Sequence, residues 1–256
     1  MSSTGNILFI GGHDPSGGAG LQADIETACA HNCRAFSLVT CLTTQDSRDI
    51  QQIYPQDSAV FEAQLRLLLA DVEPDWVKIG LIGDLGLARV LQRRLDGLPL
   101  IIDPVLASGG GTTVADRELT VFIRDHLLPH TELLTPNRSE ARRLADCADT
   151  DAAAQRLLAS GCKRVLLTGA DEAAANTVKN RLLWQGGSRE FQHPLLPHRY
   201  HGSGCTLASA CACNLASGLD WELAIEKALD WTWKTLLAAE HPGHGQRLPN
   251  RRIPNT

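Results

Sequence analysis

The sequence has few aromatic residues, no excess of positive charge and no long hydrophobic segment. Phe, Trp and Tyr together make up 5% of its 256 residues. The 24 basic residues are outnumbered by 29 acidic ones, which gives a net charge of -5, and no more than two basic residues are adjacent. Because a nucleic-acid groove requires a basic surface, this composition argues against nucleic-acid binding.

The chain also lacks the signals of membrane insertion and secretion. No segment approaches the ~18 consecutive apolar residues of a membrane span, and the polar first residues do not form a signal peptide. None of the eight cysteines forms a C-x-x-C pair, so neither a zinc site nor a disulfide framework is indicated. We therefore expect a cytoplasmic protein with reduced cysteines and no membrane contact.

What the sequence does contain is an alternation of short apolar segments with longer amphipathic ones. This alternation is typical of α/β proteins with a parallel sheet, whose strands are covered on both faces. With 43% hydrophobic residues and no linker or repeat, the chain is expected to form a single domain, residues 1–256. The strands are predicted at residues 7–11, 36–42, 76–80, 100–103, 132–135, 164–168, 181–185 and 189–193.

Two amphipathic helices are indicated by apolar residues at helical spacing. One begins after the N-cap residue Asp57, and the other lies near the C-terminus. We assign both apolar stripes to core packing and to no other role. The stripes consist of Phe61, Leu65, Leu68, Leu69 and Val72 in the first helix and of Ile225, Leu229, Trp233 and Leu236 in the second.

The first predicted strand is followed by a glycine-rich segment, GHDPSGGAG, residues 12–20. Its glycines permit positive φ and let a ligand approach the backbone, and Ser16 is predicted to cap the helix that follows. The segment is not a Walker A loop, but Gly18 to Ala23 match the dinucleotide fingerprint, with Asp46 about where a ribose-binding acid would lie. A tight turn without a ligand is the third interpretation of these residues.

Two further strand ends carry residues that suit either a metal site or a local structural role. Asp103, in IDPV, ends a buried strand, where its carboxylate could hold hydrated Mg²⁺ or start a turn before Pro104. Asn137 and Glu140, in TPNRSE, have a spacing that allows them to organise metal-bound water or to form a capping box. The sequence leaves both alternatives open.

The segment HGSGCTLASA, residues 201–210, is the sharpest of these patterns. Gly202 and Gly204 flank Ser203, and Cys205 opens a predicted helix whose first N–H groups and positive dipole end favour an anion. The same position is expected to lower the pKa of the thiol. A buried structural cysteine is the alternative interpretation of Cys205.

Taken together and in this order, GHDPSGGAGLQAD, KIGL, DPV, TPN-x-x-E and HGSGCTLASA resemble the hydroxymethylpyrimidine/phosphomethylpyrimidine kinases of thiamine biosynthesis. That family is a branch of the ribokinase-like superfamily, which also contains pyridoxal kinases. The resemblance extends from Ile7 to about Arg247. It implies a three-layer α/β/α fold with a central, mostly parallel sheet, and a homodimer. It also implies transfer of the γ-phosphoryl group of ATP, with Mg²⁺, to a pyrimidine alcohol and then to its monophosphate.

The resemblance further implies roles for individual residues. At the pyrimidine end it places Gly12, Asp24 and Gln45. The implied anion hole consists of Gly202, Ser203, Gly204 and Cys205, with Cys205 placed to activate the acceptor oxygen. At the other end, Asp103 and Glu140 are implied at Mg²⁺, and Asn137, Thr168 and Gly169 at ATP.

The chain departs from the family pattern at several positions. His13 stands where many members have Thr or Ser, and the segment 108–111 replaces a more usual Lys-Ser-Gly. Lysines are missing from LLTGADE, residues 166–172, and from the residues before HGSGC, where Arg199 is the suggested substitute. These departures put in question how the ATP phosphates are contacted.

Three other functions are open at this stage. Pyridoxal kinase activity is the main alternative, because that subfamily shares the cysteine and the anion hole, although the GGAG segment and Gln45 favour a pyrimidine. The others are a dinucleotide-binding protein and a ligand-binding protein that has lost catalysis. The combined presence of Asp103, Asn137, Glu140 and Cys205 argues against lost catalysis.

Overall fold

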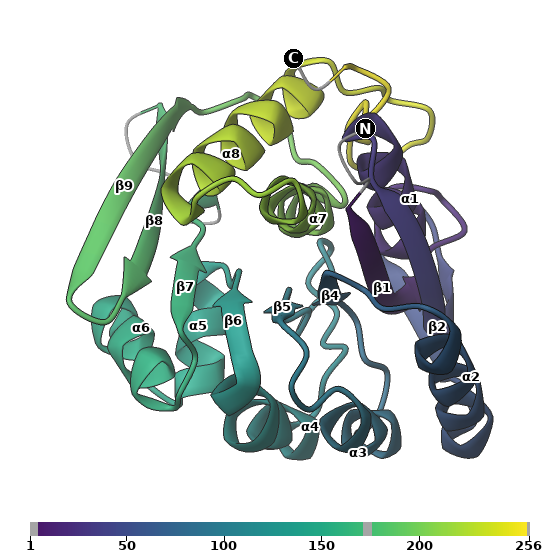
Figure 1. Cartoon of the computed structure of the whole chain (residues 1–256). Coiled ribbons are helices and arrows are strands. Elements are labelled where there is room, and N and C mark those ends of the chain that lie inside the picture. Colours follow the sequence, from purple (N-terminus) through teal and green to yellow (C-terminus); the bar gives the residue numbers. More distant parts are fainter. Residues whose placement is uncertain (1–4, 171–175, 255–256) are drawn as a thin grey trace.

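The computed structural model describes residues 5–170 and 176–254. Within these ranges it contains one sheet of nine strands, in the order β3-β2-β1-β4-β5-β6-β7-β8-β9 (Figure 1). The strands are β1 (Asn6–His13), β2 (Arg34–Gln45), β3 (Ile50–Pro55), β4 (Trp76–Ile79), β5 (Leu100–Ile102), β6 (Thr131–Leu134), β7 (Arg164–Leu167), β8 (Thr177–Trp184) and β9 (Gly187–Pro194).

The sheet is parallel in its centre and antiparallel at its edges. All pairs between β2 and β7 in the sheet order are parallel, whereas β3 pairs with β2, β8 with β7 and β9 with β8 in antiparallel fashion. The six parallel strands therefore end at the same edge of the sheet. The predicted α/β class with a mostly parallel central sheet is confirmed.

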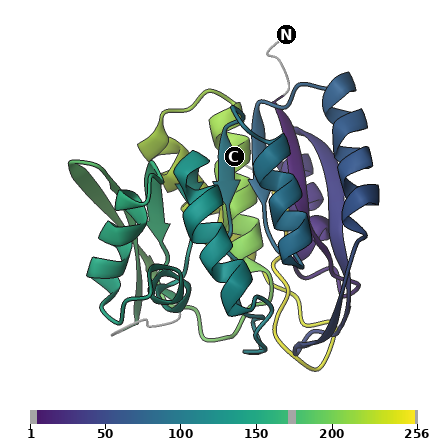
Figure 2. The same cartoon turned by 90° about the horizontal axis from the view of Figure 1, so that it is seen from below.

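Helices cover both faces of the sheet, so the molecule has three layers. One face carries α1 (Gly20–Ala30), α7 (Ser203–Ala216) and α8 (Trp221–Leu237) (Figure 1). The other carries α2 (Ser58–Asp71), α3 (Leu85–Arg94), α4 (Arg117–Phe122), α5 (Arg138–Ala145) and α6 (Thr150–Ala159), with the short π and 3-10 helices η1 (Ile123–Leu127) and η2 (Leu128–His130) after α4. Figure 2 shows helices of this second layer lying side by side in front of the sheet.

Each helical layer has its own apolar core against the sheet. Successive side chains of a strand point to opposite faces. Accordingly, Leu8 and Ile10 of β1 belong to the core under α2 to α6, whereas Ile7 and Phe9 belong to the core under α1, α7 and α8. This double burial explains why the central strands are apolar throughout.

Both predicted amphipathic helices are present, as α2 and α8. The Asp57 carboxylate caps α2 by accepting hydrogen bonds from the N–H groups of Ala59 and Val60, both at 3.0 Å. In the described part of the chain, no helix is both long enough and apolar enough to cross a membrane.

The strands around the β2–β3 hairpin differ from the predicted ones, and β8 begins at Thr177, before the predicted start at 181. β2 continues to Gln45, three residues beyond the predicted end at 42, and β3 was not predicted. β3 is an edge strand with several exposed polar residues in IQQIYP, so it lacks the apolar pattern by which buried strands are recognised.

Candidate active site

The carboxyl ends of the parallel strands open onto a cavity of about 770 Å³. A volume of this size is typical of small-molecule sites. Every predicted site residue except Gly169 lines it: Gly12, Asp24, Gln45, Asp103, Asn137, Glu140, Thr168, Gly202, Ser203, Gly204 and Cys205. The tertiary structure thus brings together residues from segments spread over most of the chain.

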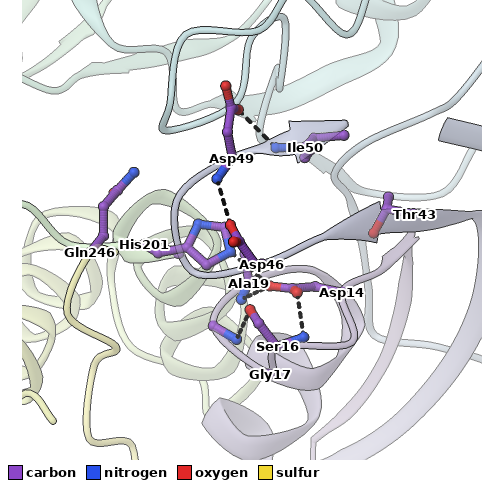
Figure 3. A network of polar contacts seen from close by, with 12 residues as sticks. Asp14, Ser16, Gly17, Ala19, Thr43, Asp46, Asp49, Ile50, His201 and Gln246 are labelled. Atoms are coloured by element: carbon purple, nitrogen blue, oxygen red, sulfur yellow. Dashed lines mark hydrogen bonds and ion pairs between the residues drawn. The ribbon is translucent and has the colours of Figure 1, made fainter. Parts of the chain in front are cut away.

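The glycine-rich segment after β1 is organised by Asp14 (Figure 3). The Asp14 carboxylate accepts hydrogen bonds from the N–H groups of Ser16 and Ala19, both at 2.8 Å. α1 begins at Gly20 without a side-chain cap, and Ser16 Oγ accepts the N–H of Gly18 at 3.3 Å. The prediction that Ser16 caps this helix is wrong, because the loop turns around the Asp14 carboxylate before the helix begins.

Close packing requires glycine at two positions of this segment. A Cβ at Gly12 would lie 3.0 Å from Cys41 Sγ and 3.1 Å from Leu81 Cδ2. Gly20 has a φ of +58°, and a Cβ there would clash with the carbonyl oxygen of Gly12. The wall of the cavity at Gly12 is therefore bare backbone, which is open to a ligand.

A buried charged cluster lines the cavity next to this wall. The ammonium group of Lys78, a fully buried residue of β4, donates to Asp24 Oδ1 at 2.9 Å. Ser209 of α7 donates to the same oxygen at 2.7 Å. Burial alone would lower the pKa of Lys78, but the neighbouring Asp24 and Asp103 carboxylates raise it above its usual value, so the ammonium stays charged. Lys78 is the first residue of the KIGL motif, for which the sequence predicts no role.

Asp103 lies at the junction of this cluster with α7. Its Oδ2 is 3.9 Å from Lys78 Nζ and is buried with no hydrogen-bond donor among the described residues. Burial raises the pKa of this carboxyl, against the opposing effects of Lys78 and Cys205. A Cβ at Gly204 would lie 3.6 Å from Asp103 Oδ1, so the carboxylate lies beside the start of α7.

α7 begins at the predicted anion site. Gly202 is its N-cap, with a φ of +84°, a conformation that favours glycine. Ser203, Gly204 and Cys205 form its first turn, whose N–H groups have no acceptor within the helix. Because these groups line the cavity at the positive end of a helix of 14 residues, they are suited to bind an anion there.

The predicted lowering of the Cys205 pKa is wrong. Burial raises the pKa of this thiol to about 12, and the Asp103 and Asp24 carboxylates add to the rise, while Lys78 opposes it. The helix start favours a thiolate, but two carboxylates and burial outweigh that effect. Cys205 is therefore a neutral thiol at physiological pH.

Asn137 and Glu140 form the capping box that was one of their two predicted roles. The Asn137 side chain accepts the N–H of Glu140 at 2.8 Å, and Glu140 Oε2 accepts the N–H of Asn137 at 2.9 Å. Both residues also line the cavity, because α5 begins directly after β6. The capping geometry fixes where the Glu140 carboxylate lies and does not exclude a role at a metal.

Thr168 and Gly169 follow β7 on the far side of α5. Thr168 forms a bridge with Asn137, and its N–H donates to the carbonyl of Pro136 at 2.9 Å. The N–H of Gly169 donates to Asn180 Oδ1 at 3.1 Å, and a Cβ at Gly169 would clash with the carbonyl oxygen of Lys179. Thr168 therefore faces the cavity, whereas Gly169 is held against β8.

The cavity has an apolar end that the sequence did not reveal. Its lining includes Val178, Leu195, Leu196, Leu229, Trp233 and Leu236. Trp233 is half-buried, donates its indole N–H to the carbonyl of Pro194 at 2.9 Å and stacks with His193. The assignment of the α8 stripe to core packing alone is thus incomplete. Helical spacing shows which residues share a face, but not that part of this face borders a cavity.

Asp14, Gln45 and His201 meet at the opposite, polar end. His201 Nε2 lies 2.7 Å from Asp14 Oδ2, joining the glycine-rich segment to the residue before the anion site (Figure 3). Gln45 Oε1 is buried without a hydrogen-bond partner among the described residues. No role was predicted for Asp14 or His201, although both lie within the quoted motifs.

Three of the departures from the family pattern also border the cavity. His13, Arg199 and residues Ser108, Gly109 and Gly111 belong to its lining. The end of LLTGADE falls within residues 171–175, which lie outside the described part of the chain. Asp46, the acid of the dinucleotide alternative, is exposed and accepts the N–H groups of Arg48 and Asp49 in the turn before β3.

The donors in this cavity fit a Mg²⁺ ion that is held partly by substrate. Asp103 offers a buried carboxylate oxygen to which no described residue donates, and oxygen ligands are those that Mg²⁺ prefers. Among the described residues, no group of three or more His, Cys, Asp or Glu side chains could hold a metal by itself. Mg²⁺ in phosphoryl-transfer sites is typically held by one or two carboxylates plus phosphates and water, so this donor set is sufficient.

The sequence matches the family of phosphomethylpyrimidine kinases over residues 14–250. The hydroxymethylpyrimidine/phosphomethylpyrimidine kinase of Synechococcus elongatus is 36% identical over 93% of this chain and 94% of its own length. The enzyme of the same name from Escherichia coli is 32% identical over 94% of each chain.

Solved structures agree with this assignment at the level of the fold. Pyridoxal kinase from Bacillus subtilis, solved as an ADP complex, superposes with a TM-score of 0.90 at 25% identity, over 97% of this chain and 98% of that one. Phosphomethylpyrimidine kinase from Clostridium difficile superposes with a TM-score of 0.78 at 25% identity, over 90% and 98%. The predicted ribokinase-like fold and the predicted family are both confirmed: the chain belongs to the phosphomethylpyrimidine kinase family.

Proposed function

We propose that this kinase transfers the γ-phosphoryl group of ATP first to hydroxymethylpyrimidine and then to the resulting monophosphate. The observation that carries the proposal is the single cavity in which the Lys78–Asp24–Asp103 cluster meets the N-terminus of α7. Phosphoryl transfer requires in-line positioning and neutralisation of the transferring oxygens more than covalent chemistry. The helix N-terminus supplies part of that neutralisation, and a metal ion held at Asp103 would supply the rest.

The two ends of the cavity suit the two substrates. At the polar end, hydrogen bonds to an aminopyrimidine are offered by the bare backbone at Gly12 and by Gln45 Oε1, which has no partner in the described part of the chain. Asp24 holds Lys78 in place there. At the apolar end, Trp233 and its neighbours offer a surface to the adenine ring. The phosphates then extend past Asn137 and Thr168 toward α7.

The acceptor oxygen reacts at the start of α7. It forms a bond to the γ-phosphorus as the bond from that phosphorus to the β–γ bridging oxygen breaks, and ADP leaves. In the first step the proton of the alcohol passes to water, and in the second the acceptor is a phosphate oxygen that is already deprotonated. The N–H groups of Ser203, Gly204 and Cys205 stabilise the charge on the phosphoryl oxygens. Since Cys205 is neutral, we assign it to contacting the acceptor oxygen and not to removing its proton.

Mg²⁺ would be held by Asp103 and Glu140 and, when bound, would neutralise charge on the ATP phosphates. Arg199 is the candidate replacement for a missing family lysine, because it lines the cavity near α7. The single domain, the homodimer and the cytoplasmic location stay predictions.

The decisive experiment is a comparison of acceptors with purified protein, ATP and Mg²⁺. We expect ADP release with hydroxymethylpyrimidine and with its monophosphate, and little with pyridoxal or pyridoxine. Pyridoxal is the second candidate acceptor, because the Bacillus subtilis pyridoxal kinase has so similar a fold. Turnover of pyridoxal without turnover of either pyrimidine would overturn the proposed specificity.

A further inference from the structure

Arg251 lies outside the cavity, close to the C-terminus, yet contacts both segments that form the phosphate end. Its guanidinium is 1% exposed. Nε donates to Thr206 Oγ1 at 2.8 Å, Nη1 donates to the carbonyl of Gly17 at 3.3 Å, and Nη2 donates to the carbonyl of Gly18. Its carboxylate partner is Glu26, 3.1 Å from Nη1. One side chain therefore connects α1, the glycine-rich segment and α7.

The contact with α7 reaches the anion site through Thr206. The Thr206 hydroxyl, itself fully buried, accepts from Arg251 and donates to the carbonyl of Gly202 at 2.8 Å. A peptide unit is planar and trans, so its C=O and the following N–H point in opposite directions. Fixing the carbonyl of Gly202 therefore fixes the direction of the Ser203 N–H, the first donor of the anion site.

Arg251 also supports the start of α7 through its contact with the glycine-rich segment, residues 12–20. A Cβ at Gly202 would clash with the carbonyl oxygen of Gly18, and a Cβ at Gly18 would clash with the His201 ring. The two backbones are thus in direct contact, and Arg251 holds the carbonyls of Gly17 and Gly18 from behind. On the cavity side, the Asp14–His201 pair joins the same two segments (Figure 3).

The C-terminal segment is itself held in place, so Arg251 is rigidly presented. Arg247 forms a bridge with Tyr200, and its carbonyl accepts the N–H of His201 at 2.9 Å. The N–H of Asn250 donates to the carbonyl of Thr235 in α8 at 3.0 Å. A planar guanidinium presents its donors from three nitrogens in a fixed fork, whereas an ammonium group presents its three donors from one atom.

We propose that Arg251 is a positioning residue for phosphoryl transfer: it holds the glycine-rich segment and the first turn of α7 as one unit, so that the anion-binding N–H groups converge. This inference rests on the proposed function of the α7 start. Arg251 touches no substrate, and its effect passes through Thr206, Gly17 and Gly18. Sites that stabilise a transition state depend on such support, since a displacement of ~1 Å costs roughly 10²-fold in rate.

The test compares Arg251→Ala, Arg251→Lys and a matched control from the same segment, Arg252→Ala. The Arg252 side chain is 76% exposed and pairs with Glu240 at the surface. We expect Arg251→Ala to lose roughly 10²-fold in kcat with a much smaller change in KM for ATP. Arg251→Lys should recover little, and Arg252→Ala should behave as wild type. Added guanidinium ion, well below denaturing concentrations, should restore part of the kcat of Arg251→Ala and leave wild type unchanged.

A loss of thermal stability without a loss of kcat in Arg251→Ala would overturn the inference, as would a loss of kcat that guanidinium does not restore. If Arg251→Ala does not fold, Thr206→Val and Thr206→Ser provide the same comparison, because only serine keeps the relaying hydroxyl. Equal kcat in those two variants would also overturn the inference. Absence of turnover in the wild type itself would instead reject the proposed function.

Discussion

The Cys205 thiol lies in the first turn of α7, with the Lys78 ammonium and the Asp103 carboxylate among its charged neighbours. A thiol in the first turn of a helix is normally acidified by the N–H groups around it. In this structure burial is the largest influence on the thiol, and the Asp103 and Asp24 carboxylates act in the same direction. Together they raise the pKa of Cys205 to about 12. A neutral thiol can contact an acceptor oxygen but is a poor base.

This protonation state predicts how the Cys205→Ala variant depends on pH. The ratio of wild-type kcat to Cys205→Ala kcat in the first phosphorylation should stay constant between about pH 6 and 8, since the thiol does not titrate there. The measurement is a pair of pH–rate profiles under saturating substrates. A ratio that rises about tenfold per pH unit would show that the thiolate is the active form.

Gln45 offers a second prediction at the level of one side chain. Its Oε1 is buried at the polar end of the cavity and has no donor within residues 5–170 and 176–254, so a substrate N–H is its natural partner. Gln45→Ala should raise KM for the pyrimidine alcohol by an amount corresponding to about 1–3 kcal/mol. KM for ATP, measured on the same preparation, is the internal control. Equal rises in both constants would point to a general folding defect.

At the scale of elements, α5 and α7 differ in how their first turns, which both line the cavity, are capped. α7 leaves its first N–H groups without side-chain caps, whereas α5 satisfies its own through the Asn137–Glu140 capping box. The uncapped helix can bind an anion, and the capped one presents an acidic side chain. The start of α7 is therefore suited to a phosphate group, and the start of α5, with its Glu140 carboxylate, is suited to the metal ion bound to that phosphate.

Glu140→Gln separates the capping role of Glu140 from its proposed role at Mg²⁺. Glutamine can still accept the N–H of Asn137, so helix stability should change by no more than about 1 kcal/mol, while the negative charge is lost. We expect the variant to require several-fold more Mg²⁺ for half-maximal activity. Glu118→Gln, an exposed acid in the first turn of α4, is the matched control. An unchanged Mg²⁺ titration in Glu140→Gln would leave only the capping role.

At the scale of the whole molecule, the cavity forms where distant segments converge. Asp14 and His201 are 187 residues apart in sequence and 2.7 Å apart in space. Burial would raise the pKa of Asp14, but hydrogen bonds from His201, Ser16 and Gln45 hold it well below the usual range. The folded chain therefore stabilises the ionised carboxylate more than the unfolded chain does.

The sign of this shift predicts an acid-dependent loss of stability. A carboxyl with a lowered folded-state pKa stabilises the fold above its unfolded pKa of about 3.9, and this contribution is lost as pH falls below that value. The difference in free energy of unfolding between wild type and Asp14→Asn should thus be largest near neutral pH and shrink in acid. Urea unfolding at a series of pH values measures it. A difference that does not vary with pH would show that folding does not favour the ionised Asp14 carboxylate. Asp71→Asn, at an exposed position, is the control for loss of a carboxylate.

The sequence alone determined the fold class and the family, because both depend on local patterns. Apolar strands separated by amphipathic helices identify a parallel sheet, and residues directly after parallel strands must gather at one edge. That rule was enough to place Asp103 and Asn137 at one cavity, whereas Cys205 comes after the antiparallel strand β9 and was placed at the site by the family resemblance. The capping alternatives for Asn137 and Glu140 were equally local, and one of them is present.

Tertiary structure decided what depends on neighbours distant in sequence. The raised pKa of Cys205 comes from burial beside Asp24 and Asp103, which the position of the thiol in its helix cannot reveal. The apolar end around Trp233 and the bonds from Arg251 to Gly17, Gly18 and Thr206 join segments that no sequence spacing connects. Local sequence sets which element a residue joins and which face it occupies. Electrostatic environment, cavity walls and support of the site arise only when the elements pack against one another.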